Sequence, residues 1–424
     1  MLHVIQTTRT EKITFLEYVN FFMLLSLSGI NFFIDNDNYL LLAVAVNLFL
    51  FIIRKEKIDN GFFFFFLFFI FLTIAQTIWL SDGSFQSTVG FFLRLILAYL
   101  VLKNCSNFLQ TFLNIIFFLS IAALFFYTLF LIFPSLENFL FTHKNFWDYE
   151  KTNEVKKSLI IYNIFHESSD ESGGRGLFGL PRNSGPFWEP GAFAGYLTLA
   201  IGFEMILFRK FSWRIYIYLT ALLSTFSTTG YAATGLFFLC YFIFLETNKK
   251  RKQLMVPLLL IIFIFMIFNL EFLAEKVMVQ AQQFKEGQIY SSQSANDTRI
   301  GSAALDFSDL QRSPLFGTGP SDETRYGKKE ELFMRTNGVT DILVRLGIIG
   351  FIFLSWNFFF SFKRFFIRMR VIRTNTATYI AIFILFFISL SETYFLLPFF
   401  WSLALLQYAE VPDMEFYDYE SSSA

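Results

Sequence analysis

The chain contains little cysteine, histidine or charge. Its two cysteines, Cys105 and Cys240, form no CxxC motif and offer no pattern for a disulfide framework. It has three histidines, and no cluster of Asp, Glu and His has the spacing of metal ligands, so the sequence predicts no metal centre. Only 16% of the residues are charged, and the 34 Lys and Arg balance the 34 Asp and Glu. Net charge therefore predicts no nucleic-acid partner.

Hydrophobic residues, in contrast, make up 55% of the 424 residues, and the mean hydropathy is +0.51. They gather in uncharged runs of roughly 20 residues, the length that crosses the hydrocarbon of a bilayer. Lipid requires backbone groups to be bonded within the segment, and the alternating segments of about 10 residues typical of a transmembrane barrel are lacking. The sequence therefore predicts an all-α polytopic membrane protein with about twelve transmembrane helices. We place them at 13–34, 39–53, 61–80, 88–102, 108–133, 189–208, 214–227, 230–246, 255–272, 337–361, 376–390 and 394–409.

Positive charge is distributed unevenly along the chain. Clusters of Lys and Arg fall on alternate connections between the apolar runs, whereas the short turns 81–87, 227–229 and 391–393 contain none. By the positive-inside rule both termini are cytoplasmic and two long connections lie outside. No A-x-A-like cleavage site follows the first apolar run, which indicates a retained helix rather than a signal peptide. The expected division is an N-terminal transmembrane bundle at 1–133, a first long outer loop at 134–188, central helices at 189–272, a second long outer loop at 273–336, C-terminal helices at 337–409 and an acidic cytoplasmic tail at 410–424.

The two long outer connections are expected to have structure of their own. Apolar and charged residues at helical spacing predict short helices within 137–166, at 274–284 and at 300–312. Loops of this length are usually functional or disordered. They carry several arginines, whose guanidinium groups fork onto phosphate oxygens and suit capture of a lipid pyrophosphate. These are Arg175, Arg182, Arg299, Arg312, Arg325 and Arg335.

Residues 182–196 are the most informative stretch of the chain. They close the first outer connection with the sequence RNSGPFWEPGAFAGY and run directly into an apolar helix. A cation (Arg182) and a carboxylate (Glu189) are thereby placed where water meets the membrane, which suits a substrate with one end in lipid and the other in water. Arg299 has a similar context, because it opens an expected helix that is followed by a second Gly/Pro turn at 314–320.

Four segments in this order carry a resemblance to a known family. They are Arg182-x-x-Gly185-x-Phe187-x-Glu189-Pro190-Gly191-x-Phe193-Ala194, Ser224-Thr-Phe-Ser227-Thr-Thr-Gly230-Tyr231, Arg299 with Pro314-Leu315-x-Gly317-x-Gly319, and Asn337 with Leu343-x-x-x-Gly347-x-x-Gly350. Together with the hydropathy pattern, they resemble the superfamily of polytopic O-antigen polymerases and O-antigen ligases over most of the chain.

The resemblance implies a membrane glycosyltransferase that needs no nucleotide, no metal and no other cofactor. A polymerase of this kind, serving an O-antigen, a capsule or an exopolysaccharide, transfers a glycan from undecaprenyl pyrophosphate to a sugar hydroxyl of the next lipid-linked repeat unit. The reaction takes place on the outer face of the bacterial inner membrane. The implied partners are the undecaprenyl-pyrophosphate-linked oligosaccharide, membrane lipid, a chain-length regulator and a flippase.

The leaving pyrophosphate requires fixed cations in the transition state. Loss of one preorganised contact of this kind typically costs about 2.7–4 kcal/mol in the barrier. We expect Arg182 and Arg299 to bind and stabilise the pyrophosphate. Arg175, Arg312 or Arg335 would assist them.

The acceptor hydroxyl requires an orienting group and a base. Glu189 is the first candidate, with Asn337 positioning the acceptor and Tyr231 of the second motif contacting substrate. The alternative for Glu189 is a carboxylate at a helix N-terminus, stabilised there by the helix dipole. His166 is the second candidate for the base.

Ionisable groups within the apolar spans are costly and count as functional hypotheses. Arg94 lies near the middle of the fourth span, where it is expected to meet Glu204, Glu17 or the donor pyrophosphate. Asp341 and Arg345 are spaced i, i+4 on the late helix and are expected to pair with each other.

Two rivals of the polymerase hypothesis are open at this point. An O-antigen ligase joins the finished glycan to lipid A core, but Thr336 precedes Asn337 where ligases carry a catalytic His. Thr228 or Thr229 also stands where the second motif often has Arg. A lipid-linked oligosaccharide flippase or transporter would concentrate polar groups near the bilayer midplane, often in repeated halves with broken helices. Here the polar residues gather in two unequal outer loops and no repeat is visible, which favours the polymerase.

Overall fold

A helix occupies each of the twelve apolar spans expected from the sequence. The computed structural model describes residues 13–80, 84–136, 139, 148–151, 154–165, 180–269, 299–321, 324–325 and 336–410. Its helices in the spans are α1 (Phe15–Ser26), α2 (Asp37–Ile53), α3 (Asn60–Leu80), α4 (Phe85–Asn104), α5 (Phe108–Ile132), α7 (Pro190–Phe208), α8 (Trp213–Ser224), α9 (Thr228–Cys240) continued by the π-helix η2 (Tyr241–Leu245), α10 (Lys249–Asn269), α14 (Gly338–Arg368), α15 (Thr374–Ser389) and α16 (Pro398–Ala404) with the 3-10 helix η4 (Leu406–Tyr408). One more helix, α13 (Arg299–Arg312), lies in the second outer connection, as expected for 300–312.

Six of these helices, within the described ranges, are long and apolar enough to cross a membrane. They are α3, α4, α5, α7, α9 with η2, and α14. The helices α1, α2 and α15 are apolar but shorter. The helical, membrane-embedded character of the protein is therefore confirmed, whereas twelve crossings stay a prediction.

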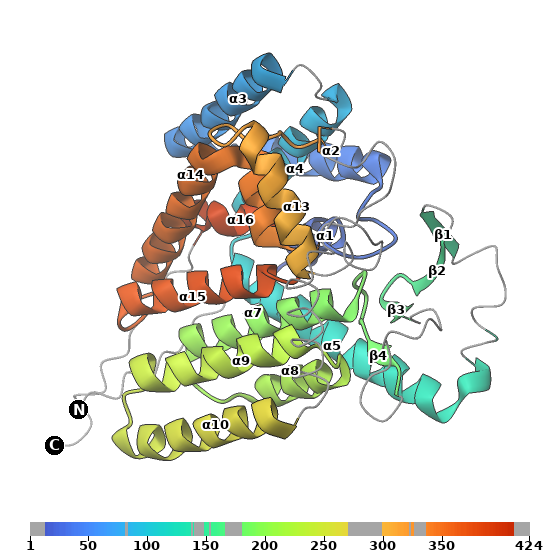
Figure 1. The fold of residues 1–424 in the computed structure, drawn as a ribbon, viewed down its shortest axis with the longest axis vertical. Coiled ribbons are helices and arrows are strands. Elements are labelled where there is room, and N and C mark those ends of the chain that lie inside the picture. Colours follow the sequence, from blue (N-terminus) through green and yellow to red (C-terminus); the bar gives the residue numbers. More distant parts are fainter. Residues whose placement is uncertain are drawn as a thin grey trace.

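The first outer connection contains strands where we expected helices. A four-stranded antiparallel sheet takes the order β1 (Asp148–Lys151), β2 (Glu154–Leu159), β3 (Tyr162–Phe165) and β4 (Arg182–Asn183), at one side of the helices (Figure 1). The expectations of an all-α protein and of helix across 148–165 are therefore wrong. β-Branched residues such as Val155 and Ile164 favour strands. In addition, β3 pairs with the distant β4, which places Phe165 opposite Arg182, and local helical spacing cannot reveal such pairing.

The helix α7 lies at the centre of the helical part of the molecule. Its neighbours are α5, α8, α9 and α15 (Figure 1). Of the residues in its apolar stretch, 94% are buried inside the protein. Small residues permit this close packing. A Cβ on Gly195 would collide with the hydroxyl of Tyr394, and a Cβ on Gly230 of α9 would approach that of Ala194 to 2.5 Å. The position of the α7 N-terminus is therefore set by protein contacts on all sides.

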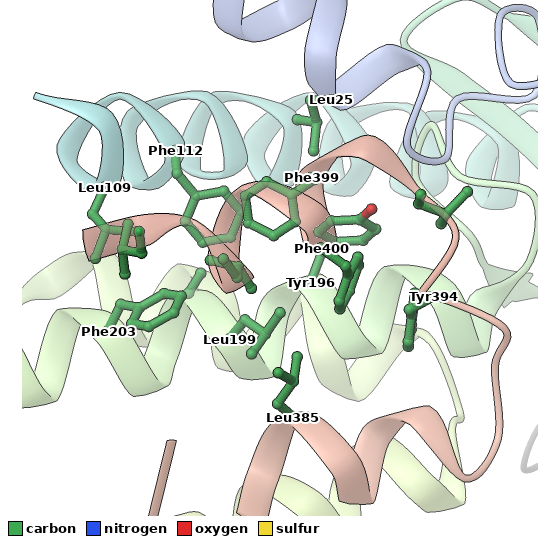
Figure 2. Packing of buried hydrophobic residues seen from close by; sticks show 14 of the residues in the cluster. Leu25, Leu109, Phe112, Tyr196, Leu199, Phe203, Leu385, Tyr394, Phe399 and Phe400 are labelled. Carbon is green, nitrogen blue, oxygen red and sulfur yellow. The ribbon is translucent and has the colours of Figure 1, made fainter. Parts of the chain in front are cut away.

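Aromatic rings from distant parts of the chain form the core beside α7 (Figure 2). Phe399 of α16 stacks on Phe112 of α5 with ring centroids 4.8 Å apart, and Phe400 stacks on Tyr394 at 4.6 Å. Tyr196 of α7 stacks on Phe187 at 4.3 Å. Buried aromatic pairs of this kind add stability beyond the area they bury. They join the N-terminal, central and C-terminal helices into one core.

The helix α14 is interrupted at Gly347, where φ is 65° and ψ is 178°. The Gly/Pro turn at 314–320 enters this break. Thr318 N and Gly319 N donate to the carbonyls of α14 residues 344 and 345 at 2.8 and 3.0 Å, and the amides of residues 348 and 349 donate back to residues 314 and 315. Gly317 and Gly347 lie in backbone contact, so that a Cβ on either would collide with the other. The third and fourth motif segments therefore interlock, and the turn supplies partners for the backbone groups freed by the break.

Candidate functional site

Arg182 lies on β4, against the turn between α8 and α9. Its Nε donates to the carbonyl of Thr225 at 3.2 Å, and its charge acts on the nearby hydroxyl of Tyr231. The neighbouring Asn183 is fully buried and donates through Nδ2 to Ser224 Oγ at 2.9 Å. The half-buried Arg182 is thus held between the sheet and a helical turn. The structure places Arg182 near Tyr231, so that the first and second motif segments meet here.

Glu189 occupies the N-cap of α7. Its side chain makes no capping hydrogen bond within the described part of the chain, and Pro190 takes the first helical position. Proline suits that position because its missing N–H would have no helical partner. The carboxylate therefore lies at the positive end of the helix dipole but makes no capping hydrogen bond to the helix.

A second carboxylate, Glu392, lies beside Glu189. It comes from the turn between α15 and α16 and is only 3% exposed. Both carboxylates approach Gly191. A Cβ built on this glycine would collide with Glu392 Oε1 and would lie 3.8 Å from Glu189 Oε1. The sequence analysis missed Glu392. An acidic residue in a cation-free turn between two apolar helices was the available signal.

The N-terminus of α14 meets the same place. Asn337 caps it, accepting through Oδ1 from the amides of Val339 and Thr340 at 3.1 and 3.2 Å. A Cβ on Gly338 would collide with the carbonyl oxygen of Glu392. The N-termini of α7 and α14 therefore both lie against Glu392, and their dipoles favour negative charge there. Asn337 also has a structural role, because its side-chain oxygen is engaged in the cap.

The start of α13 lies next to the start of α14. Thr336 N donates to Ser302 Oγ at 3.1 Å, and Thr340 Oγ1 donates to Asp306 Oδ2 at 2.6 Å. Arg299 begins α13, so its backbone is about one helical turn from Ser302. This arrangement places the backbone of Arg299 near Asn337.

A buried ionic network ties the second outer connection to α14. Arg325 contacts Asp306 at 3.3 Å and Asp341 at 2.7 Å, and Arg345 Nε contacts Asp341 Oδ2 at 3.0 Å. The expected pair of Asp341 and Arg345 is therefore confirmed. Arg325, which the sequence suggested only as one of several loop cations, is buried here together with Asp306. These buried ion pairs attach the segment around Arg325 to α13 and α14.

Arg312, another predicted residue, lies at the far end of α13 from this convergence. Arg312 ends α13, opposite Arg299, where it is exposed and donates through Nη1 to the carbonyl of Thr324 at 3.1 Å. Arg94 on α4 is subject to the charges of Asp35, Asp37 and Arg345.

The two carboxylates proposed as partners of Arg94 have polar contacts elsewhere. Glu17 accepts hydrogen bonds from the backbone and hydroxyl of Ser106, and Glu204 accepts one from Ser212. Three further predicted site residues, Arg175, His166 and Arg335, lie outside the described residues, as does the side chain of Arg299.

The site therefore combines two carboxylates, two helix N-termini, a cation on β4 and an amide cap at one end of the helices. Among the residues that the structure describes, no group of three His, Cys, Asp or Glu could hold a metal ion. Such a site can bind a polar acceptor and exchange a proton with it. No family model, no curated protein and no solved structure matches the chain.

Proposed function

We propose that the protein is a membrane glycosyltransferase that polymerises a surface polysaccharide from lipid-linked repeat units. The observation that carries the proposal is the convergence of Glu189, Asn337, Glu392 and the start of α13 at one end of the helices, beside the β-strand that bears Arg182. The resemblance of the four sequence segments to the O-antigen polymerase and ligase superfamily supports the same proposal.

In the proposed reaction a sugar hydroxyl of the acceptor attacks the anomeric carbon of the donor glycan. The bond from that carbon to the bridging phosphate oxygen breaks, and undecaprenyl pyrophosphate leaves with the electron pair. Arg182 and Arg299 meet the charge that develops on the pyrophosphate, since a guanidinium forks onto two phosphate oxygens. Donor activation is already present in the pyrophosphate bond, so the reaction needs neither nucleotide nor metal.

The acceptor proton requires a base, and the Glu189–Glu392 pair is our assignment for it. Glu189 is half-buried and not engaged in the α7 cap, so it can accept the proton from the hydroxyl. Glu392 is held by packing against Gly191 and Gly338. A general base held in place contributes about 10²–10⁴-fold to the rate. His166 and Asn337 keep their proposed roles as second base and acceptor-positioning group.

The proposed setting is the bacterial inner membrane, with both termini in the cytoplasm and the site on the outer face. The cation-rich end of α14 at Arg368 would then be cytoplasmic. Counting back from Arg368, the 21 residues to Ile348 span roughly 30 Å, the thickness of the hydrocarbon. Residues 338–346 and the site at their start then lie at the outer surface, where a lipid-linked glycan presents its sugars.

A transporter of lipid-linked oligosaccharide is the second candidate, favoured by the break in α14 at Gly347. Transporters often bind substrate at broken helices near the bilayer midplane. With Arg368 at the cytoplasmic boundary, as proposed, this break would lie at the outer boundary instead, which supports the polymerase. The ligase alternative still faces Thr336 in place of the catalytic His of that group.

The test is a reaction of the purified, reconstituted protein with lipid-linked repeat units of its own host, without nucleotide or metal. We expect a ladder of polymer from the wild type and none from Arg182→Gln or Arg299→Gln. The control is Arg364→Gln, which removes a cation near the other end of α14, where Arg364 contacts Gln407, and should leave the ladder intact. A single adduct formed only with lipid A core would identify a ligase. Substrate crossing liposome bilayers without any product would identify a transporter.

A further inference from the structure

A narrow cleft of about 20 Å³ opens beside the break in α14. It is formed by α3, the start of α4 and the turn that enters the break, through Thr73, Gln76, Thr77, Thr88, residues 318–321 and Thr324. A space of about 10–15 Å³ is needed for one water molecule, so the cleft admits one hydroxyl-sized group. All of its lining residues are uncharged.

Most of the lining side chains offer acceptors rather than donors to such a group. The hydroxyl protons of Thr73, Thr77 and Thr88 are donated to backbone carbonyls one turn earlier, at 2.9, 2.9 and 3.2 Å. Thr324 Oγ1 donates to the carbonyl of residue 318 at 2.8 Å. Gln76 uses its amide nitrogen on the carbonyls of residues 316 and 345, which leaves its Oε1 as an acceptor beside residue 319. The matching ligand group is therefore a hydrogen-bond donor.

The charges nearby decide between a cationic and a neutral donor. Arg345 donates through Nη1 to the carbonyl of Pro320 at 2.6 Å, and Arg312 donates to that of Thr324 at 3.1 Å. Two guanidinium groups are thus bonded directly to residues of the cleft wall. Arg345 is paired with Asp341, and no carboxylate among the described residues lines the cleft, so a metal cation or an ammonium group would find no counter-charge there. A neutral hydroxyl or amide N–H fits.

An exposed indole ring is linked to the wall of this cleft through Arg312, which in turn bonds Thr324 of the wall. Trp79 lies three residues after Gln76 on α3, is 65% exposed, and donates through Nε1 to the carbonyl of Arg312 at 3.4 Å. That bond tethers the ring while leaving most of its surface open. An open aromatic face beside a hydrogen-bonding cleft is the combination that binds a sugar, because a pyranose has an apolar face of C–H groups and a rim of hydroxyls.

We propose that Trp79 and this cleft form a carbohydrate subsite. One sugar hydroxyl enters the cleft as donor, and the ring of the same sugar lies on the indole. The subsite rests on the proposed function, in which it holds the glycan of a lipid-linked substrate. Along α14 it lies about 12 Å from Asn337, since residue 345 is eight positions further. It therefore engages a sugar removed from the reacting bond.

The test measures binding of a water-soluble probe. The probe is the oligosaccharide released by mild acid from the host's lipid-linked repeat unit, and saturation-transfer NMR on the full-length reconstituted protein gives its affinity. We expect Trp79→Ala to weaken binding about tenfold, and Thr77→Val, which removes one acceptor at constant shape, about fivefold. The matched control is Trp356→Ala, because Trp356 on α14 is 61% exposed but lies outside the cleft. It should bind as the wild type does.

Each outcome bears on the subsite separately from the polymerase. Wild-type affinity in both Trp79→Ala and Thr77→Val would overturn the subsite, and would identify Trp79 as an interfacial anchor. Equal losses in Trp356→Ala would overturn it as well. If Trp79→Ala does not fold, Thr77→Val decides alone. A polymer ladder without oligosaccharide binding would contradict the subsite and support the polymerase. Binding that depends on Trp79 and Thr77, without a ladder, would support the subsite and contradict the polymerase.

Discussion

The two Gly/Pro turns of this protein are held in different ways: the first runs directly into α7, whereas the second follows α13 and enters the break in α14. The turn before α7 is fixed by neutral side chains: Asn163 donates to the carbonyl of Phe187 at 3.0 Å, and Asn183 accepts from the amide of Gly185 at 2.9 Å. The turn at 314–320 is fixed by the open backbone of α14 and by buried charges. At the first turn, the carboxylate of Glu189 makes no capping hydrogen bond. At the second, the charged side chain of Arg345 is bonded to Pro320 and Asp341 and so holds the turn in place.

This difference distinguishes charged side chains that hold the fold together from one that is available for the reaction. A charged side chain that completes a buried network cannot be removed without exposing its partners to an apolar interior. A carboxylate that makes no capping hydrogen bond can be replaced by an amide at little cost to the fold. We therefore expect substitutions at the second turn to affect folding, and substitutions at the first to affect the reaction.

Asp341→Asn should have the largest effect on stability. It removes the carboxylate that contacts both Arg325 and Arg345 and leaves two buried guanidinium groups with reduced compensation. Breaking a buried pair in this way costs about 3–5 kcal/mol. The measurement is the midpoint of thermal unfolding of the purified protein, with Glu189→Gln as the matched change from carboxylate to amide. Equal midpoints for the two variants would contradict the contrast drawn between the turns.

Gly347→Ala should have the next largest effect. Its backbone conformation is one that essentially only glycine adopts, which costs about 1–3 kcal/mol in other residues, and its new Cβ would also collide with the turn at Gly317. We expect a lower unfolding midpoint and a lower yield of folded protein. Gly90→Ala is the control, because nothing lies within 4 Å of a Cβ there. A wild-type midpoint for Gly347→Ala would mean that α14 is not broken at this residue.

Glu189→Gln should change stability least, within about 0.5 kcal/mol, as for substitutions that break no buried contact. Its polymer formation should nevertheless fall about 10²–10⁴-fold if Glu189 is the base. The two quantities are measured on one preparation, by thermal unfolding and by the rate of ladder formation. Full activity with lowered stability would assign Glu189 to the alternative role of helix stabilisation. Loss of both would leave the carboxylate structural as well.

Much of the fold was accessible from local pattern. The apolar runs predicted helices at all twelve places, because a run of apolar residues in lipid has no other way to satisfy its backbone. The spacing of Asp341 and Arg345 predicted their ion pair, because residues four apart share one face of a helix. The pattern failed at 148–165, where pairing with the distant β4 decides the structure.

The candidate site was accessible in part. Motif context identified Arg182, Glu189 and Asn337, and the structure places each at a helix or strand terminus beside another motif. Glu392 was missed, because its proximity to Glu189 depends on the packing of the turn after α15 against the start of α7. No spacing along the chain encodes that contact.

The sequence by itself determined that this is a helical membrane protein and which polar segments enter its helices, because hydropathy and turn residues act over a few neighbours. Only the tertiary structure decided which of those segments meet. The interlocked glycines of α14, the buried pairing of Arg325 with Asp306 and Asp341, and the two adjacent carboxylates all join residues far apart in the chain. Such contacts arise from packing, which depends on the shape of the whole core rather than on any local pattern.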